Sequence, residues 1–129
     1  MRTRLAADAT APGEARAFVT AQLEATPLPH GVTVDDVVLV TSELVTNAVQ
    51  AGGTTLEVEL LASPQRIELV VTDDGPGWPA RTDASETDTS GRGLRIVDHL
   101  AHIWDAVRRP QGKAVRVRWF DQERQRTQP

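Results

Sequence analysis

Cysteine is absent from the 129 residues of this chain, and so is tyrosine. Disulfides and thiolate chemistry are therefore excluded. With only two phenylalanines and three tryptophans, the sequence offers no aromatic platform on which nucleic-acid bases could stack. No apolar run approaches the roughly 18 residues of a membrane span. The first ten residues lack the apolar stretch of a signal peptide, which predicts a cytoplasmic protein.

The length of 129 residues is typical of one domain, so we expect residues 1–129 to fold together, with 121–129 as a disordered tail. Hydrophobic residues make up 40% of the chain and charged residues 25%, which is close to the average for a soluble globular protein. The net charge of −4 argues against nucleic acid as the main partner.

Hydrophobic periodicity predicts three helices and two strand hairpins. Thr33 is the expected N-cap of the strongest helix, because two acids follow it in the first turn. The pair Gly52-Gly53 marks the expected end of this helix. Strands that are neighbours in sequence should pair, so we expect an α+β fold, a two-layer α/β sandwich whose mixed, mostly antiparallel sheet carries helices on one face. The expected helices cover 14–25, the stretch between Thr33 and Gly52, and 94–102; the expected strands cover 54–62, 66–74, 103–108 and 113–120, with a weaker strand pattern in 2–8.

Two polar residues of the strongest helix could carry chemistry. Glu43 and Asn47 are four residues apart, so they lie on one stripe of the helix, beside the apolar face formed by residues such as Val40 and Leu44. A carboxylate can take a proton from a nucleophile, and an amide oxygen is a suitable ligand for Mg²⁺. The alternative interpretation is two ordinary polar residues on a helix surface.

The segment "VVTDDGPGWP" places an acid and two glycines at the end of a predicted strand. Asp73 could accept a hydrogen bond from the exocyclic amine of a base such as adenine. Gly75 and Gly77 lack side chains, which would let a ring or a phosphate approach the backbone closely. Taken alone, the same segment also fits a simple Asp-Gly turn.

A second glycine pair occurs in "SGRGLRIVDHL". Gly91 and Gly93 precede the third predicted helix, where free backbone N–H groups can bind anions, and Arg92 adds a positive charge. A glycine-rich approach to a helix is the alternative. His99 and His102 have a spacing that can hold a metal, but no third ligand is evident, so we expect ordinary histidines.

The three motifs occur in a fixed order: E-x-x-x-N on a helix, D-x-G-x-G after a strand, and G-x-G-L at a helix start. In this order they resemble the boxes of the GHKL, or histidine-kinase-like, ATPases with the Bergerat fold. Within that superfamily the chain resembles the small bacterial anti-sigma-factor serine kinases. The similarity extends from about residue 15 to residue 120.

The resemblance implies ATP and Mg²⁺ as cofactors and assigns a role to each motif. Glu43 would be the general base for a substrate serine hydroxyl, and Asn47 would coordinate Mg²⁺. Asp73 would bind the adenine amine, with Gly75 and Gly77 shaping that side of the pocket. Residues 80–90 would form a short ATP lid. The residues facing the phosphates would be Gly91, Arg92, Gly93 and Leu94.

The function that the resemblance implies is an ATP-binding, Mg²⁺-dependent protein serine/threonine kinase that regulates transcription. Its substrate would be an anti-anti-sigma (STAS-type) protein, and it would also bind a sigma factor. Relatives of this kind suggest a homodimer. Neither direct nucleic-acid binding nor membrane association is expected.

The chain departs from the resemblance at two places. Gln50-Ala51-Gly52 stand where many relatives carry a basic residue or histidine, and Lys113-Ala114-Val115 stand where many have threonine. Both departures concern nucleotide affinity and phosphoryl transfer. The alternative function is therefore a non-catalytic partner-switching module that holds ATP without turnover, or has lost ATP binding, and sequesters a sigma factor.

Overall fold

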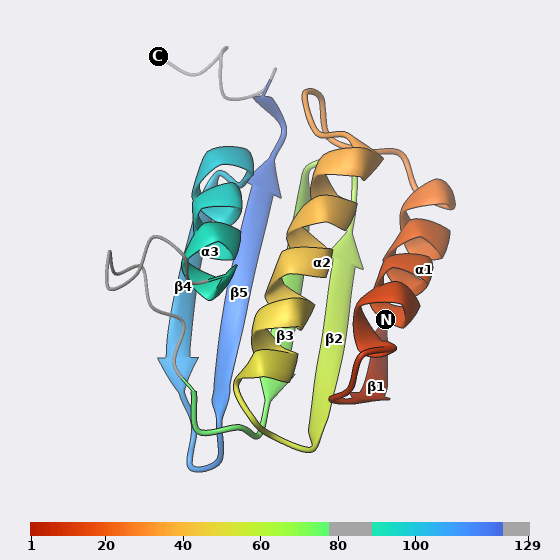
Figure 1. Cartoon of the computed structure of the whole chain (residues 1–129). Coiled ribbons are helices and arrows are strands. Elements are labelled where there is room, and N and C mark those ends of the chain that lie inside the picture. Colours follow the sequence, from red (N-terminus) through yellow and green to blue (C-terminus); the bar gives the residue numbers. More distant parts are fainter. Residues whose placement is uncertain (78–88, 123–129) are drawn as a thin grey trace.

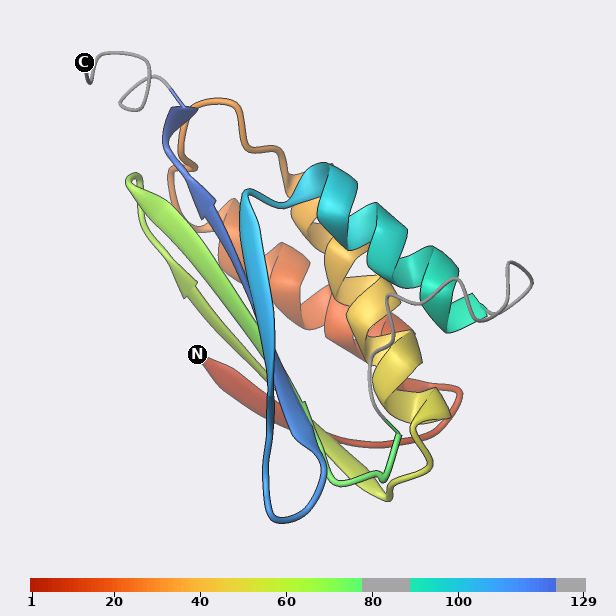
Figure 2. The same cartoon turned by 90° about the vertical axis from the view of Figure 1, so that its left-hand side faces the viewer.

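The computed structural model describes residues 1–77 and 89–122, and for 89–94 it describes the backbone alone. The described residues form two layers, a sheet and a layer of helices that covers one of its faces (Figures 1 and 2). The expected α+β sandwich is thereby confirmed. The elements are β1 (Arg2–Ala6), α1 (Ala11–Glu24), α2 (Val34–Gln50), β2 (Thr55–Ala62), β3 (Arg66–Asp73), α3 (Thr89–Leu100), β4 (Ile103–Arg108) and β5 (Lys113–Phe120).

The five strands are arranged in the order β1-β2-β3-β5-β4. Each neighbouring pair is antiparallel, so the sheet lacks the parallel pairing that a mixed sheet would contain. β3 is the central strand and pairs with both β2 and β5. Its last residue, Asp73, lies opposite Leu56 on one side and Lys113 on the other. The end of β3 is therefore held by two neighbouring strands.

The alternating sequence of each central strand separates the two faces of the sheet. In β3 the buried residues alternate with half-buried ones, and β5 repeats the pattern from Lys113 onwards. The face turned away from the helices carries cross-strand ion pairs, such as Arg2 with Glu59 at 3.4 Å and Arg116 with Asp105 at 3.0 Å. Such surface pairs contribute little to stability. The core therefore lies between the sheet and the helices.

The core is built mainly from aliphatic side chains of α1, α2 and the three central strands. Trp119 of β5 is its largest buried side chain, and its indole Nε1–H donates a hydrogen bond to the carbonyl oxygen of Leu100 at 3.0 Å. This bond joins β5 to the last turn of α3. Other fully buried side chains of this core include Val19, Val37, Val40, Val45, Val58, Ile67 and Leu69.

Helix α2 begins as predicted. Thr33 has an extended backbone, and its hydroxyl oxygen accepts a hydrogen bond from the N–H of Asp36 at 3.1 Å. The helix ends at Gln50, just before Gly52, whose φ of +90° is a conformation that favours glycine. α2 packs against α1 on one side and α3 on the other (Figure 2). It is therefore the central helix of its layer.

The third helix differs from the sequence prediction of 94–102. α3 starts five residues earlier, at Thr89, so that Gly91 and Gly93 are part of the helix and do not precede it. Glycine is a weak helix former, but packing against α2 outweighs a cost of about 1 kcal/mol per glycine. Nine of the eleven residues of the expected ATP lid, 80–88, lie outside the described residues, as do 123–129 of the expected tail.

Candidate nucleotide-binding site

The predicted stripe on α2 is present at the edge of the buried face. Asn47 is 8% exposed, whereas Glu43, one turn earlier, is half-buried. Glu43 makes no hydrogen bond or ion pair with any described residue. The amide Nδ2 of Asn47 is buried, and the structure gives it no hydrogen-bond partner. A buried amide without a partner is destabilising, so this atom is suited to a ligand that brings an acceptor.

Asp73 is buried at the end of β3, and both of its carboxylate oxygens are engaged. Oδ1 accepts a hydrogen bond from the N–H of Gly75 at 3.0 Å, and Oδ2 lies 2.6 Å from Nζ of Lys113. The side chains of Asp73 and Lys113 are 1% and 3% exposed. The predicted base-binding carboxylate is therefore part of a buried ion pair.

Lys113 is the residue of this region whose contact the sequence reasoning missed. In the sequence it stands out only as part of a departure from the family pattern. The signal was the alternation of β5, in which Lys113, Val115, Val117 and Trp119 are all buried. Because Lys113 occupies a core-facing position beside Asp73 in the β3–β5 register, an ion pair between them could have been expected.

Asp74, the neighbour of Asp73, has a different structural role. Its carboxylate accepts hydrogen bonds from the N–H of Thr54 at 2.7 Å, the hydroxyl of Thr54 at 2.6 Å and the N–H of Thr55 at 3.1 Å. These hydrogen bonds, chiefly that from the Thr54 hydroxyl, lower the pKa of Asp74 to about 2. Asp74 thus joins the end of β3 to the start of β2.

The two glycines after Asp73 pack against the end of α2. A Cβ on Gly75 would lie 2.6 Å from the carbonyl oxygen of Ala51, and one on Gly77 would lie 2.9 Å from the Cα of Ala51. The N–H of Gly77 also donates to the Ala51 carbonyl at 3.1 Å. Close packing of the helix end is therefore one reason for these glycines, and their contact with a base stays a prediction.

The third motif lies in α3. Gly91 is in the first turn of the helix, while Arg92, Gly93 and Leu94 continue it. Because the first few N–H groups of a helix have no partner within it, the start of α3 can still offer donors to an anion. Which phosphate contacts these four residues make stays a prediction, since the structure describes only their backbone.

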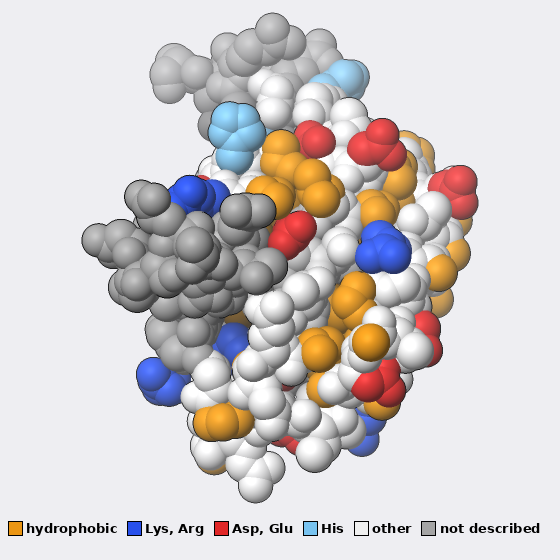
Figure 3. Space-filling model, in the orientation of Figure 1, with side chains coloured by type: hydrophobic (Ala, Val, Ile, Leu, Met, Phe, Trp, Pro, Cys, Tyr) orange, Lys and Arg blue, Asp and Glu red, His pale blue; other side chains and the backbone are white. Residues whose placement is uncertain are grey.

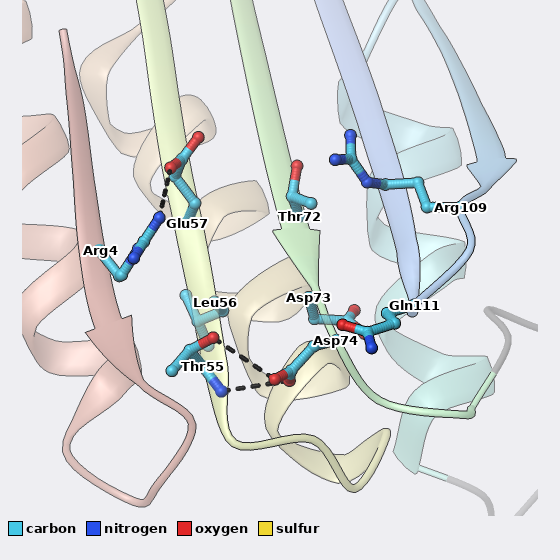
Figure 4. Close-up of a pocket in the computed structure, with 9 residues that line it drawn as sticks. All are labelled: Arg4, Thr55, Leu56, Glu57, Thr72, Asp73, Asp74, Arg109 and Gln111. Carbon is cyan, nitrogen blue, oxygen red and sulfur yellow. Dashed lines mark hydrogen bonds and ion pairs between the residues drawn. The ribbon is translucent and has the colours of Figure 1, made fainter.

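The structure contains one cavity on the outer face of the sheet and another on the helical side of the molecule. One, of about 360 Å³, lies on the sheet face turned away from the helices, with Arg4, Glu57, Thr72 and Arg109 projecting into it (Figure 4). The stripe of Glu43 and Asn47 belongs to the helical layer, so this cavity is separate from it. The second is a shallow apolar hollow of about 430 Å³ between α2 and α3, on the face where Figure 3 shows hydrophobic side chains gathered; it is lined by Leu39, Arg95, Ile96, His99 and Leu100.

The two histidines do not form a metal site within the described residues, in which no cluster of three metal-ligating side chains occurs. His102 follows α3, and its Nδ1 accepts a hydrogen bond from the N–H of Phe120 at 2.8 Å. Its ring stacks on that of Phe120. Burial lowers the pKa of His102 below its ordinary value of 6.5. His102 is thus held in place by a hydrogen bond and a ring contact with Phe120.

Comparison with known proteins identifies the class. The model of the histidine kinase-like ATPase domain matches residues 5–119, so the chain belongs to this family of ATP-binding domains. The fold is similar to a nucleotide-free catalytic domain of the histidine kinase ThkA, with a TM-score of 0.55, 16% identity, and 94% and 96% of the two chains covered. A second structure of that domain gives a TM-score of 0.50 at 12% identity, covering 94% and 97%. No curated protein matches significantly.

The residues present fit the ligand that the family implies. The buried Nδ2 of Asn47 has no partner and could donate to a phosphate oxygen, and the oxygen of the same amide is of the type that binds Mg²⁺. Lys113 has three N–H donors and one recorded acceptor among the described residues, and a carboxylate such as Asp73 can accept more than two hydrogen bonds.

The described part of the chain contains no helix that is both long and apolar enough to cross a membrane.

Proposed function

We propose that this chain is an ATP- and Mg²⁺-dependent protein serine/threonine kinase of the anti-sigma-factor type. The observation that carries the proposal is the arrangement on α2, where Glu43 makes no hydrogen bond or ion pair with the described residues and the buried Nδ2 of Asn47, one turn away, has no hydrogen-bond partner. Phosphoryl transfer depends mainly on positioning and charge neutralisation, so a base and a metal ligand on one rigid helix are well suited to it.

Each residue would contribute one part of the reaction. Asn47 would hold the Mg²⁺ that neutralises the phosphates, and Glu43 would accept the proton of the attacking serine hydroxyl. The start of α3, with Gly91, would offer backbone N–H groups to the phosphates. The γ-phosphoryl group would then pass from ATP to the serine oxygen, leaving ADP. Arg92, Gly93 and Leu94 would complete the phosphate side.

A protein substrate is supported by the apolar hollow beside this stripe. Leu39 lines the hollow and is 43% exposed. It lies four residues before Glu43, on the same side of α2. An apolar side chain of an anti-anti-sigma protein placed against Leu39 would bring a neighbouring serine towards Glu43. We further propose that a sigma factor is the second partner and that the kinase acts as a homodimer.

Calorimetry tests the nucleotide part of the proposal. Mg·ATP is titrated into the wild type, Asn47→Ala and, as a matched control on another helix, Glu24→Gln. We expect the control to bind like the wild type and Asn47→Ala to bind at least tenfold more weakly in the presence of Mg²⁺. A folded wild type that binds no ATP would overturn the kinase and leave a partner-binding module that has lost nucleotide.

Transfer of radioactive phosphate tests the catalytic part. The wild type, Glu43→Gln and Glu24→Gln are incubated with labelled ATP and a candidate anti-anti-sigma protein. We expect Glu43→Gln to bind ATP normally and to lose at least 100-fold in transfer rate, a typical contribution of a general base. If Glu43→Gln transfers phosphate as fast as the control, Glu43 is not the base. ATP binding without transfer by the wild type would favour the non-catalytic alternative.

A further inference from the structure

Lys113 is the only lysine in the sequence, all thirteen other basic side chains being arginine. It is also among the most buried polar residues, with 2% of its surface exposed. Burial of an ammonium group is costly unless charge and hydrogen bonds compensate for it. Asp73 supplies the charge and one acceptor at 2.6 Å, and no second acceptor is recorded among the described residues. Two N–H donors of Lys113 thus have no acceptor among the described residues.

We propose that Asp73 and Lys113 together bind the edge of the adenine ring, with Lys113 acting as a specificity-determining residue. Asp73 Oδ2 would accept a hydrogen bond from the exocyclic amine, and Lys113 Nζ would donate one to the adjacent ring nitrogen N1. This inference rests on the proposed ATP binding but not on phosphoryl transfer. It extends the role of Asp73, which alone would recognise only the amine.

The spacing of the pair fits this edge. The amine nitrogen and N1 of adenine are bonded to the same carbon, so C–N bonds of about 1.33 Å place them about 2.3 Å apart. The acceptor Oδ2 and the donor Nζ are 2.6 Å apart. Two nearly parallel hydrogen bonds can therefore form between the two edges, as they do between paired bases. A guanine ring presents the opposite order, acceptor then donor, and would have to turn over to fit.

The strand pairing makes the pair a rigid receptor. Asp73 and Lys113 are direct partners in the β3–β5 ladder, and Gly75 fixes the other carboxylate oxygen. A receptor that is already oriented loses little entropy when the ligand binds. Both side chains are nearly inaccessible, however, so a base can reach them only after neighbouring atoms move. We therefore expect association of ATP to be slower than a diffusion-controlled encounter.

The test compares ATP with 1-deazaadenosine triphosphate, in which N1 is replaced by a C–H group. Both are titrated into the wild type and into Lys113→Met by calorimetry, with melting temperatures to confirm folding. We expect the wild type to bind the deaza analogue at least tenfold more weakly, since a hydrogen bond to a charged donor is lost. In Lys113→Met the two ligands should bind within about twofold of each other.

Because Lys113→Met leaves the Asp73 carboxylate buried without its partner, the double variant Asp73→Asn/Lys113→Met serves as a neutral second background. A direct readout comes from labelling the single lysine with ¹⁵N, whose side-chain resonance should shift with ATP and much less with the deaza analogue. Equal affinities of the wild type for the two ligands would overturn the proposal, while leaving ATP binding and the kinase intact. Tighter ATP binding by Lys113→Met would also overturn it, because Lys113 would then compete with the base.

A folded wild type that binds neither nucleotide would overturn this inference and the proposed kinase together. ATP binding with the expected discrimination, but without phosphate transfer, would support the base contact and refute only the catalytic role. The two proposals can therefore fail separately.

Discussion

The carboxylate of Asp74 accepts hydrogen bonds from both the backbone N–H and the hydroxyl of Thr54, at 2.7 and 2.6 Å. These two hydrogen bonds hold the segment that links α2 to β2 against the end of β3. Gly53 makes this contact possible, because a Cβ at this position would lie 2.1 Å from Oδ1 of Asp74. The segment after Asp73 thus serves as a structural joint as well as a candidate ligand site.

Replacing Asp74 by Asn should destabilise the fold, because an amide offers only one acceptor oxygen and no charge. Folding lowers the pKa of Asp74 from 3.8 to about 2, so between these values the unfolded chain binds more protons than the folded chain. The contribution of Asp74 is therefore complete above pH 3.8 and is lost as the pH falls through 2. Melting temperatures of the wild type and Asp74→Asn should differ at pH 7 and converge in acid. A constant difference down to pH 2 would contradict this assignment.

Substitutions of the two neighbouring acids, Asp73 and Asp74, should differ in their effect on ATP affinity. Asp73→Asn is expected to weaken ATP binding strongly, since it alters the group assigned to the base, whereas Asp74→Asn should leave affinity nearly unchanged while the chain is folded. Titration calorimetry well below both melting temperatures makes the comparison. Equal losses in the two variants would show that the base contact has been assigned to the wrong residue or shared between them.

Gly112 should be far more sensitive to substitution than Gly13. Gly112 has a φ of +86°, and an added Cβ would lie 1.8 Å from the carbonyl oxygen of Asp73. The backbone conformation alone costs about 1–2 kcal/mol for alanine, and the clash adds to this. Gly13 lies within α1, where a Cβ would meet only the end of Arg16 at 3.6 Å, so Gly13→Ala should stabilise by about 0.5–1 kcal/mol. Urea unfolding of both variants tests this pair; similar free-energy changes would refute the turn geometry.

His102 should make the fold less stable in mild acid. Burial lowers its pKa in the folded chain, so around pH 6.5 the unfolded chain binds more protons, and the free energy of unfolding decreases as the pH falls below 6.5. Protonation also removes the acceptor for the Phe120 N–H. His102→Asn keeps an acceptor and does not titrate, so its stability should fall less than that of the wild type between pH 7.5 and pH 5, values chosen on either side of the ordinary pKa of about 6.5. Parallel curves would exclude His102 as the cause.

Lys113 should be protected from amine-directed reagents, because its side chain is 3% exposed and ion-paired. With acetic anhydride under native conditions, we expect acetylation of the terminal amine well before acetylation of Lys113. In urea the single lysine should react at the rate of a free amine. Mass spectrometry of tryptic fragments follows both sites. Rapid native modification of Lys113 would contradict the buried pair with Asp73.

The sequence predicted the elements whose signals are local. The N-cap at Thr33 has the expected hydrogen bond, and the bounds of β4 and β5 agree with the predicted strands. In β5 the buried and half-buried residues alternate along the whole strand. The predicted start of α3 was wrong. Two glycines lower the helix propensity of this segment, whereas packing against α2 maintains the helix. Propensity describes the isolated segment, and this helix depends on its neighbour.

The candidate site shows the same division. Glu43 and Asn47 could be placed at the edge of a buried face from helical periodicity alone, and the structure agrees. The ion pair between Asp73 and Lys113 joins residues 40 positions apart, so the alternation of β5 indicates that Lys113 is buried, but only the strand order identifies its partner. The packing of Gly75 on Ala51 is likewise a tertiary contact that no local pattern encodes.

The position of β5 as the last strand in sequence, yet next to the central strand, has a consequence for the order of assembly. α1, α2 and the first three strands are complete in sequence once Asp73 has been added, but the partner of Asp73 is synthesised 40 residues later. During synthesis, Asp73 gains its ion-pair partner only when β5 pairs with β3. This step has an unfavourable loop-closure entropy, because the two strands are far apart in sequence. A ribosome-bound chain ending before Lys113 should therefore fail to recognise the base, and nucleotide should preferentially stabilise chains in which β5 has docked.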